Sequence, residues 1–319
     1  MAKVPVHCSA GTFVGGSANI NRQSRNEQLK GKQTTMKTIF VTGATGNQGG
    51  AVAASLIKKG FKIKVLTRKT DSVKAQRLQK QNVDLIKGDL NDLNTFRNYL
   101  KDIDGIFSVQ TFENGIDKEI KQGIDLANLA KEYGVNHFLY SSVAGADLNT
   151  GIPHFDSKYK IENHIKQLGL PYTIIRPNSL FENFLIPQVR SRILKGKLAS
   201  PINKDKVQQF ISAVDIGEIS ADIFLNQDKY LGKTITIGSE EMDMQQVATT
   251  FSEVLDKKIS YQKFPMLLVR LVMGKDLYKM FKWMNENNAI FIKDLELFKK
   301  ENPNLTSLKH WIKINFINT

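Results

Sequence analysis

Short apolar runs alternate with longer amphipathic segments over most of the chain. The apolar runs predict strands at residues 38–42, 62–67, 84–87, 105–109, 137–141 and 172–176. Apolar residues at helical spacing predict helices at 48–59, 73–81, 93–100, 116–133 and 155–168. Strands that alternate with helices are typical of a parallel sheet with right-handed crossover connections. The pattern predicts an α/β fold built on a doubly wound parallel Rossmann sheet.

The pattern is less regular toward the C-terminus. It predicts a helix at 216–225, with Asp215 as N-cap and Glu218 completing the capping arrangement. A helix at 244–255 and a short strand at 258–265 follow. These elements indicate a smaller, partly discontinuous C-terminal α/β domain.

Residues 266–284 combine apolar residues at near-helical spacing with Arg270 and three lysines. One interpretation is a basic amphipathic helix on a membrane surface. The interpretation that we favour is a Met-rich face that lines a pocket or packs a lid. With residues near 181–201, this lid is expected to roof a substrate site.

The domain boundaries follow from these elements. We predict a cofactor-binding domain at 36–180 with 211–238, and a substrate or lid domain at 181–210 with 239–319. Residues 1–35 are polar, lack apolar periodicity and contain one acidic residue, so we expect a disordered extension. Met36 is then a plausible native start, although a true extension or a transit peptide stays an alternative.

Composition narrows the class of protein. The 319 residues are 41% hydrophobic, which is enough for a substantial core, and Cys8 is the only cysteine, so no intramolecular disulfide can form. The net charge of +14 comes from lysines spread along the chain, which favours solvated faces over a nucleic-acid interface. The sequence has no apolar run long enough to span a membrane. We expect a soluble, cytoplasmic protein, and its oligomeric state stays open.

The stretch VTGATGNQGG, residues 41–50, connects the first predicted strand to the first predicted helix. In a cofactor site, Gly43 would permit a tight turn, Gly46 would let the backbone approach a pyrophosphate, and Gly49 would permit close helix–strand contact. The helix N-terminus would offer free N–H groups to the phosphates. The alternative is a glycine-rich turn without a ligand, but the strand, glycines and helix together favour a cofactor.

The end of the second strand bears on the identity of that cofactor. An acidic residue there would bind the ribose hydroxyl of NAD, and a basic one would accept the extra phosphate of NADP. Here Arg68 and Lys69 follow Thr67, and the first acidic residue is Asp71, which is placed to cap the next helix. This favours NADP(H), the alternative being that Arg68 is an ordinary exposed charge.

Several stretches together resemble the NmrA-like family, an atypical branch of the short-chain dehydrogenases/reductases. They are GATGNQGG, the Thr67-Arg68 pair, GDL at 88–90, GVNHFLYSSVAG at 134–145, PHFDSKYKIE at 153–162 and IRPNSLFENF at 175–184. The resemblance covers residues 36–259. It implies an NADP-binding Rossmann domain with a smaller domain over the cofactor cleft.

The resemblance also implies site residues. Those at the pyrophosphate would be Gly43, Thr45, Gly46, Asn47 and Gln48, with Arg68 at the ribose phosphate and Asp89 and Leu90 at the adenine. Gly49 and Lys69 join these cofactor-binding candidates from the glycine spacing and the basic pair described above. Those toward the nicotinamide would be Val109, Gln110, Thr111, Ser141, Lys158, Pro177, Asn178, Phe181 and Asn183. Most of these positions follow predicted parallel strands, where α/β sheets bind ligands.

Catalysis is less clear from the sequence. Typical short-chain dehydrogenases use a serine after the fifth strand and a tyrosine four residues before a lysine. This chain has Ser141, and it has His154 four residues before Lys158. His154 is a candidate proton donor, and its alternative role is to pack or cap the start of its helix. Lys158 is expected to hold the cofactor.

Two functions follow. One is an NADPH-dependent oxidoreductase that reduces a small unsaturated acceptor such as a quinone, with His154 or Lys158 and water handling protons. The other is a non-catalytic NADP-binding redox sensor that acts through a protein partner. Neither hydrolase constellations nor metal-ligand spacing stands out, so we expect no metal.

Overall fold

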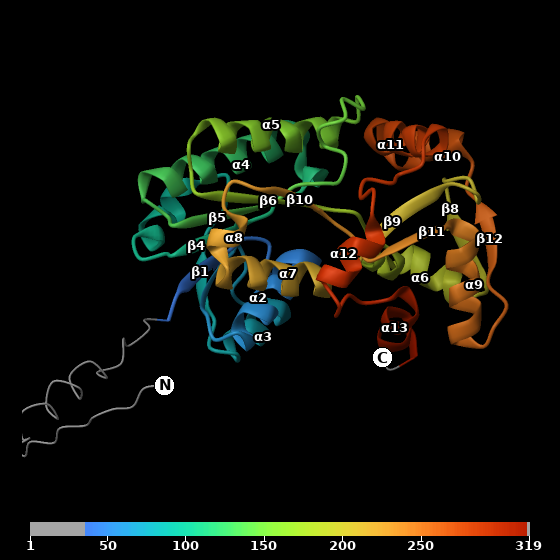
Figure 1. Cartoon of the computed structure of the whole chain (residues 1–319), viewed down its shortest axis with the longest axis horizontal. Coiled ribbons are helices and arrows are strands. Elements are labelled where there is room, and N and C mark those ends of the chain that lie inside the picture. Colours follow the sequence, from blue (N-terminus) through green and yellow to red (C-terminus); the bar gives the residue numbers. More distant parts are fainter. Residues whose placement is uncertain (1–35, 318–319) are drawn as a thin grey trace, which may run out of the picture. The chain divides into compact units, whose positions relative to one another are not determined.

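The computed structural model describes residues 36–317, so Cys8 and the predicted disorder of residues 1–35 lie outside the described part. Within it, a parallel sheet has the strand order β10-β6-β5-β4-β1-β2-β3 (Figure 1). Its strands are β1 (Thr38–Val41), β2 (Lys62–Thr67), β3 (Asp84–Lys87), β4 (Gly105–Ser108), β5 (His137–Ser141), β6 (Tyr172–Pro177) and β10 (Thr234–Ile237). Strand order reverses between β1 and β4, which confirms the doubly wound Rossmann-type α/β fold.

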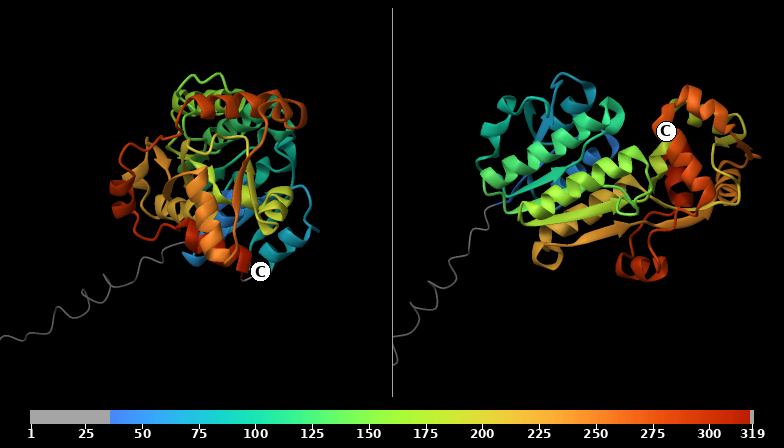
Figure 2. Two further views of the ribbon diagram at one scale, coloured as in Figure 1. Left: turned by 90° about the vertical axis from the view of Figure 1, so that its right-hand side faces the viewer. Right: turned by 90° about the horizontal axis from the view of Figure 1, so that it is seen from above.

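Helices cover both faces of this sheet. They are α2 (Asn47–Lys58), α3 (Val73–Gln79), α4 (Ile116–Glu132), α5 (Pro153–Gln167), α7 (Ala213–Leu225) and α8 (Gln227–Tyr230). Helices α4 and α5 run side by side over one face, and α2 packs against α7 on the other (Figures 1 and 2). Alternate strand residues enter the two cores: Ile39 and Val41 pack with the α2–α7 side, and Phe40 packs with the α4–α5 side.

The remaining elements form a smaller part with its own core. Its strands are β7 (Ser179–Leu180), β8 (Lys197–Ser200), β9 (Val207–Ile211), β11 (Glu240–Asp243) and β12 (Ser260–Lys263). Its helices are α6 (Pro187–Leu194), α9 (Met244–Leu255), α10 (Met266–Val272), α11 (Gly274–Glu286), α12 (Leu295–Glu301) and α13 (Leu308–Ile312). Aromatic residues, among them Phe184, Phe251 and Trp311, fill this core. The chain enters this part after β6, returns to the large sheet with α7 and leaves it again after β10, while the proposed division into two domains stays a prediction.

The predicted helix at 93–100 is wrong. Two separate 3-10 helices, Leu93–Thr95 and Arg97–Leu100, replace it. Phe96 lies between them with φ of −142° and ψ of −12°, outside the helical region, and is fully buried, with its ring stacked 5.8 Å from that of Phe40. Tertiary packing of one aromatic side chain therefore overrides the local helical pattern.

The predicted capping by Asp215 is also wrong. The N-cap of α7 is Ser212, whose side chain accepts a hydrogen bond from the Val214 N–H. The Asp215 carboxylate instead accepts bonds from the backbone N–H and the hydroxyl of Thr306, and burial raises its pKa. Glu218 accepts a bond from Ser55 of α2 at 3.0 Å, so both acids join distant segments rather than cap their own helix.

A buried ionic network joins the carboxyl ends of β5 and β6 to α5. Arg176 donates two hydrogen bonds to the Glu162 carboxylate, at 2.9 and 2.7 Å, and its third guanidinium nitrogen lies 2.6 Å from Asp147. The Ser142 hydroxyl also donates to Glu162, which is fully buried. This network fixes the ends of the strands that border the candidate site.

We expect Glu162→Gln to lower the free energy of unfolding by about 3 kcal/mol, because it leaves the buried guanidinium of Arg176 only partly compensated. Urea denaturation measures this change. Glu132→Gln is the matched control, since it removes an exposed ion pair with Arg97 and should change stability little. Equal effects of the two substitutions would contradict a structural role for the network.

Candidate functional site

The turn after β1 brings the backbone into a tight, glycine-dependent conformation. Gly43 has φ of +65°, and its carbonyl accepts a hydrogen bond from the Gly46 N–H at 2.8 Å. Beside it, the Thr42 hydroxyl accepts from the Val109 N–H at 2.9 Å, which fastens the turn to the end of β4. The turn is therefore fixed between the two strands at which the sheet order reverses.

Helix α2 approaches this turn as closely as a backbone allows. A Cβ atom added at Gly49 would lie 2.5 Å from the carbonyl group of Gly43 and the carbonyl oxygen of Thr42. Such contacts with backbone atoms cannot be relieved by rotating a side chain. No side chain caps the helix N-terminus, whose N-cap is Gly46. The first-turn N–H groups of α2 are therefore held beside the turn without a side-chain acceptor.

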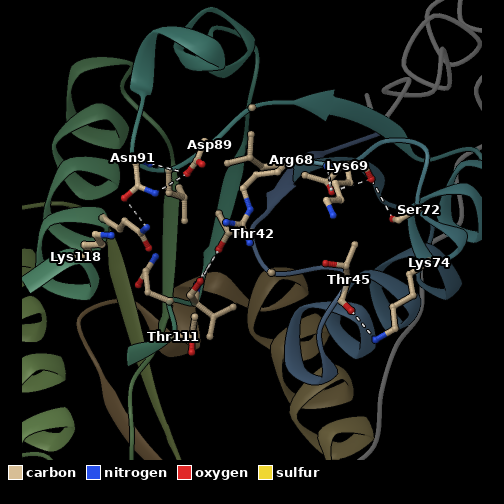
Figure 3. Close-up of a pocket in the computed structure, with 18 of the residues that line it drawn as sticks. Thr42, Thr45, Arg68, Lys69, Ser72, Lys74, Asp89, Asn91, Thr111 and Lys118 are labelled. Atoms are coloured by element: carbon tan, nitrogen blue, oxygen red, sulfur yellow. Dashed lines mark hydrogen bonds between the residues drawn. The ribbon is translucent and has the colours of Figure 1, made fainter. Parts of the chain in front are cut away.

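A cavity of about 850 Å³ opens at the carboxyl ends of β1 to β4 (Figure 3). This volume is within the range of small-molecule and cofactor sites. Its lining residues come from the turn (Thr42, Gly43, Thr45), the end of β2 and the start of α3 (Leu66–Lys69, Ser72–Lys74), the segment after β3 (Gly88–Asn91), the segment after β4 (Val109–Thr111), and α4 (Lys118, Gln122).

The cavity is strongly basic. Four cationic side chains line it, Arg68, Lys69, Lys74 and Lys118, against the single carboxylate of Asp89. Among the described residues, the Arg68 side chain has no ion pair or hydrogen bond, and in Figure 3 it points into the cavity toward Thr42. Lys74 donates to the Thr45 carbonyl at 3.0 Å, from the first turn of α3 to the glycine turn. These charges suit an anionic ligand.

The cavity gathers nine of the predicted cofactor residues from four separate strand ends. They are Gly43, Thr45, Arg68, Lys69, Asp89, Leu90, Val109, Gln110 and Thr111. Within this group, the side-chain amide of Gln110 donates to Ser108, and its buried oxygen Oε1 has no partner in residues 36–317. An unpaired buried oxygen of this kind is an available acceptor for a ligand donor.

Other predicted residues lie elsewhere. Gly46, Asn47, Gln48 and Gly49 begin α2 outside the cavity lining, and Gln48 accepts a bond from the Ser141 hydroxyl at 2.7 Å. Pro177 ends β6, and the buried Asn178 donates to the Ile237 carbonyl.

Phe181 and Asn183 both belong to the segment after β7, but they differ in burial. Phe181 is fully buried and stacks on Phe210 with ring centroids 5.9 Å apart. Asn183 is exposed and its carbonyl accepts a bond from Ile186. Phe181 therefore belongs to the core of the smaller part and does not line the basic cavity, so its contact with a cofactor stays a prediction.

Lys158 is held by a carboxylate that the sequence analysis did not identify. Its ammonium lies 2.9 Å from Glu119 of α4 and 3.4 Å from the Gln110 carbonyl. Glu119 is fully buried and also accepts a bond from the Ser157 hydroxyl. Because Gln110 also lines the cavity, this buried pair is connected to the cavity edge. The sequence did not predict Glu119 as the partner of Lys158, because α4 contains several acidic residues and only the packing of α4 against α5 brings Glu119 to this lysine.

His154 faces a different partner. Its Nδ1 atom lies 2.8 Å from a carboxylate oxygen of Asp276 on α11, and its ring stacks on Phe112 with centroids 4.5 Å apart. The residue is buried, with 5% of its surface exposed. The alternative prediction, that His154 packs at the start of its helix, matches these contacts, while its role as a proton donor stays a prediction. His137, by contrast, bonds Thr173, and burial lowers its pKa to about 4.

Comparison with known proteins places the chain in a family. The sequence model of the NmrA-like family matches residues 35–309. An NmrA-like family domain-containing protein of Dictyostelium discoideum is 32% identical over 242 residues, which cover 71% of this chain and 80% of the relative. The chain belongs to the NmrA-like family.

Solved structures show the same fold at lower identity. An NADPH-dependent quinone oxidoreductase of Escherichia coli, complexed with NADPH, has a TM-score of 0.72 and 21% identity, covering 87% of this chain and 99% of that one. The negative transcriptional regulator NmrA in complex with NADP has a TM-score of 0.70 and 21% identity, covering 86% and 94%. NmrA has also been solved with NAD.

The cavity of this NmrA-like chain includes residues that the sequence analysis missed. Lys74, Asn91, Lys118 and Gln122 line it, and Gln122 donates to Asn91 at 3.0 Å. Lys118 and Gln122 are four residues apart and so share one face of α4, a spacing that could have identified them once β4 was placed beside β1. Residues 36–317 contain no group of three or more His, Cys, Asp or Glu side chains placed to hold a metal ion.

We expect Gly49→Ala to lower the free energy of unfolding by about 1–3 kcal/mol, because the new methyl group would push α2 away from the turn. Thermal or urea denaturation measures the loss. Gly50→Ala is the matched control: its nearest contact would be 3.1 Å, and the gain in helix propensity offsets that strain. The close-contact assignment fails if the two variants are equally stable.

Proposed function

We propose that this NmrA-like chain binds NADP(H) in the basic cavity. The observation that carries the proposal is the combination of the Gly43 turn with unpaired cations at the end of β2. A dinucleotide needs close backbone approach at its pyrophosphate, and Gly46 would allow that approach, while Gly43 forms the turn and Gly49 lets α2 pack against it. The fold likeness to proteins complexed with NADPH, NADP and NAD supports a nicotinamide dinucleotide.

The preference for NADP over NAD rests on local chemistry. Residues 67–70, which follow the core of β2, contain no acid that could bind the ribose hydroxyl pair of NAD. Arg68 presents a planar guanidinium that can bind a phosphate through two hydrogen bonds. Lys69 and Lys74 add positive charge on the same side of the cavity. The extra phosphate of NADP would therefore be held at this end of the site.

Arg68→Ala is expected to weaken NADPH binding by about tenfold to a hundredfold, because the variant loses charge-assisted hydrogen bonds to the phosphate. NADH binding, which lacks that phosphate, should change by less than about threefold. Isothermal titration calorimetry measures both affinities. Lys87→Ala, an exposed cation of β3 outside the cavity lining, is the matched control and should alter neither. Equal losses for the two cofactors in Arg68→Ala would refute the phosphate assignment.

We further propose that the chain is an oxidoreductase for a small unsaturated acceptor, with a quinone as the first candidate. Reduced nicotinamide supplies a hydride, and one proton must accompany it to convert a quinone into a hydroquinone. The Lys158–Glu119 pair lies against the Gln110 backbone, where it can orient water and the cofactor-side groups. His154 is the second proton candidate, with Asp276 holding its ring in place. Ser141 supports the start of α2 through Gln48.

The second candidate is a redox sensor that binds NADP without turnover. The observation in its favour is that histidine stands where typical short-chain dehydrogenases have tyrosine, and that its ring is buried between Asp276 and Phe112. The likeness to the regulator NmrA supports the same alternative. In such a protein, different affinities for the oxidised and reduced cofactor would shift the population of a partner-binding state.

Purified chain is expected to oxidise NADPH when quinones are added, because the proposal places hydride donor and acceptor in one site. Absorbance of NADPH with a panel of quinones and enals measures this. The control replaces the chain with its Arg68→Ala variant at the same NADPH concentration, which should be slower where cofactor binding limits the rate. Tight NADP binding with no oxidation across the whole panel contradicts the enzyme and favours the sensor.

A further inference from the structure

Helix α10 carries an unusual amount of exposed apolar surface. Leu267, Leu271 and Val272 expose 71%, 73% and 74% of their surface, and Leu268 and Met273 are also exposed. Val269 is the one buried residue of the helix. Contiguous exposed apolar side chains of this kind mark interaction sites more often than isolated ones do.

Four of the exposed apolar residues lie on one side of the helix. At about 100° per residue, Leu267, Leu271, Leu268 and Val272 fall within an arc of about 140°. The buried Val269 and the exposed Arg270 each lie about 60° beyond one end of this arc. The helix therefore turns one apolar face outward and anchors itself through the opposite face.

The predicted lid helix at 266–284 is in fact two helices that differ in burial. It breaks at Gly274, whose φ is +87°. On α11, Met280, Phe281 and Met284 pack against the core of the smaller part, and Asp276 binds His154 of α5. In Figure 1, α10 lies beyond α11, on the side away from α5. The expected packing applies to α11, whereas α10 keeps its apolar face exposed.

The segment around α10 is positively charged. Residues 257–275 include five basic residues and no acidic one. Of these, Lys263, Arg270 and Lys275 are exposed and form no ion pair within the described residues. Carboxylates of the described residues therefore leave the positive charge of this segment unpaired, and Arg270 lies against the ring of Tyr278, 5.9 Å from its centroid.

We propose that this surface, formed by Leu267, Leu268, Leu271 and Val272 with the nearby basic residues Lys263, Arg270 and Lys275, docks on an anionic lipid bilayer. We call it the α10 surface. Apolar side chains would enter the acyl boundary while the basic side chains bind lipid headgroups, the two attractions that hold interfacial helices. The helix has seven residues and, within residues 36–317, no helix is long and apolar enough to span a bilayer, so the contact would be peripheral.

Charge and shape favour a lipid surface over a protein partner. The apolar face is the outward side of a short helix, which suits a broad soft surface rather than a narrow groove. A second copy would bring the same uncompensated cations into contact, and like charges repel. A bilayer with anionic headgroups supplies both the apolar interior and the compensating charge.

The test is co-sedimentation of the full chain with vesicles of phosphatidylcholine containing about one-third phosphatidylserine, compared with phosphatidylcholine alone. The full chain is expected to bind the anionic vesicles. The double variant Leu267→Glu with Leu271→Glu should bind about tenfold more weakly or less, because it places carboxylates in the apolar face. Both side chains are mostly exposed, so the fold should tolerate the change.

Two further variants make the test specific. Val214→Glu with Leu297→Glu adds the same charges at exposed apolar positions on α7 and α12, and it should bind as the unchanged chain does. Lys263→Glu with Lys275→Glu should weaken binding to anionic vesicles. Undiminished vesicle binding by the Leu267→Glu with Leu271→Glu variant would overturn the proposal, and this outcome includes the case in which the basic residues before Met36 drive the binding. A lack of vesicle binding by the full chain, together with a dimer that this variant dissociates, would also overturn the proposal.

Discussion

The close approach of α2 to the turn after β1 is the constraint on which the site depends. At Gly49, helix and turn lie so close that even a methyl group would meet backbone atoms at 2.5 Å. The contact fixes the direction of α2 and places its uncapped N-terminus beside the Gly43 turn. The Thr42 hydroxyl then ties the turn to the end of β4. The turn and the ends of four strands thereby line one cavity, with the N-terminus of α2 beside the turn. This is the arrangement on which the proposed binding of an anionic cofactor rests.

The basic residues fall into two groups, buried cations that are paired with carboxylates and exposed cations that line the cavity. Arg176 and Lys158 are buried, and each is paired with a fully buried carboxylate, Glu162 and Glu119. The cations of the cavity are exposed, and Arg68 has no charged partner among the described residues. A buried charge without a partner would cost too much to keep, whereas an exposed one stays available for a ligand. The exposed cations without carboxylate partners therefore indicate where an anion would bind, and the buried pairs stabilise the strands and helices around the site.

The elements that depend on the local pattern of apolar residues and glycines could be predicted from the sequence. The strands at 62–67, 84–87 and 137–141 have the predicted bounds, and the glycine turn lies where its spacing placed it. The sequence could not predict features that depend on distant packing. Phe96 breaks a helix to stack on Phe40, Asp215 bonds a residue 91 positions away, and Glu119 is chosen by its contact with α5. The apolar pattern of α10 resembles that of a buried helix, and only the fold shows which of its faces lacks a neighbour.

The central claim is that the cavity recognises the extra phosphate of NADP as well as the dinucleotide. The most direct measurement is a calorimetric comparison of NADPH and NADH binding to the unmodified chain under one set of conditions. We predict that NADPH binds at least about tenfold more tightly, since a free guanidinium and two lysines line the relevant end of the cavity. Equal affinities, or tighter binding of NADH, would contradict the account.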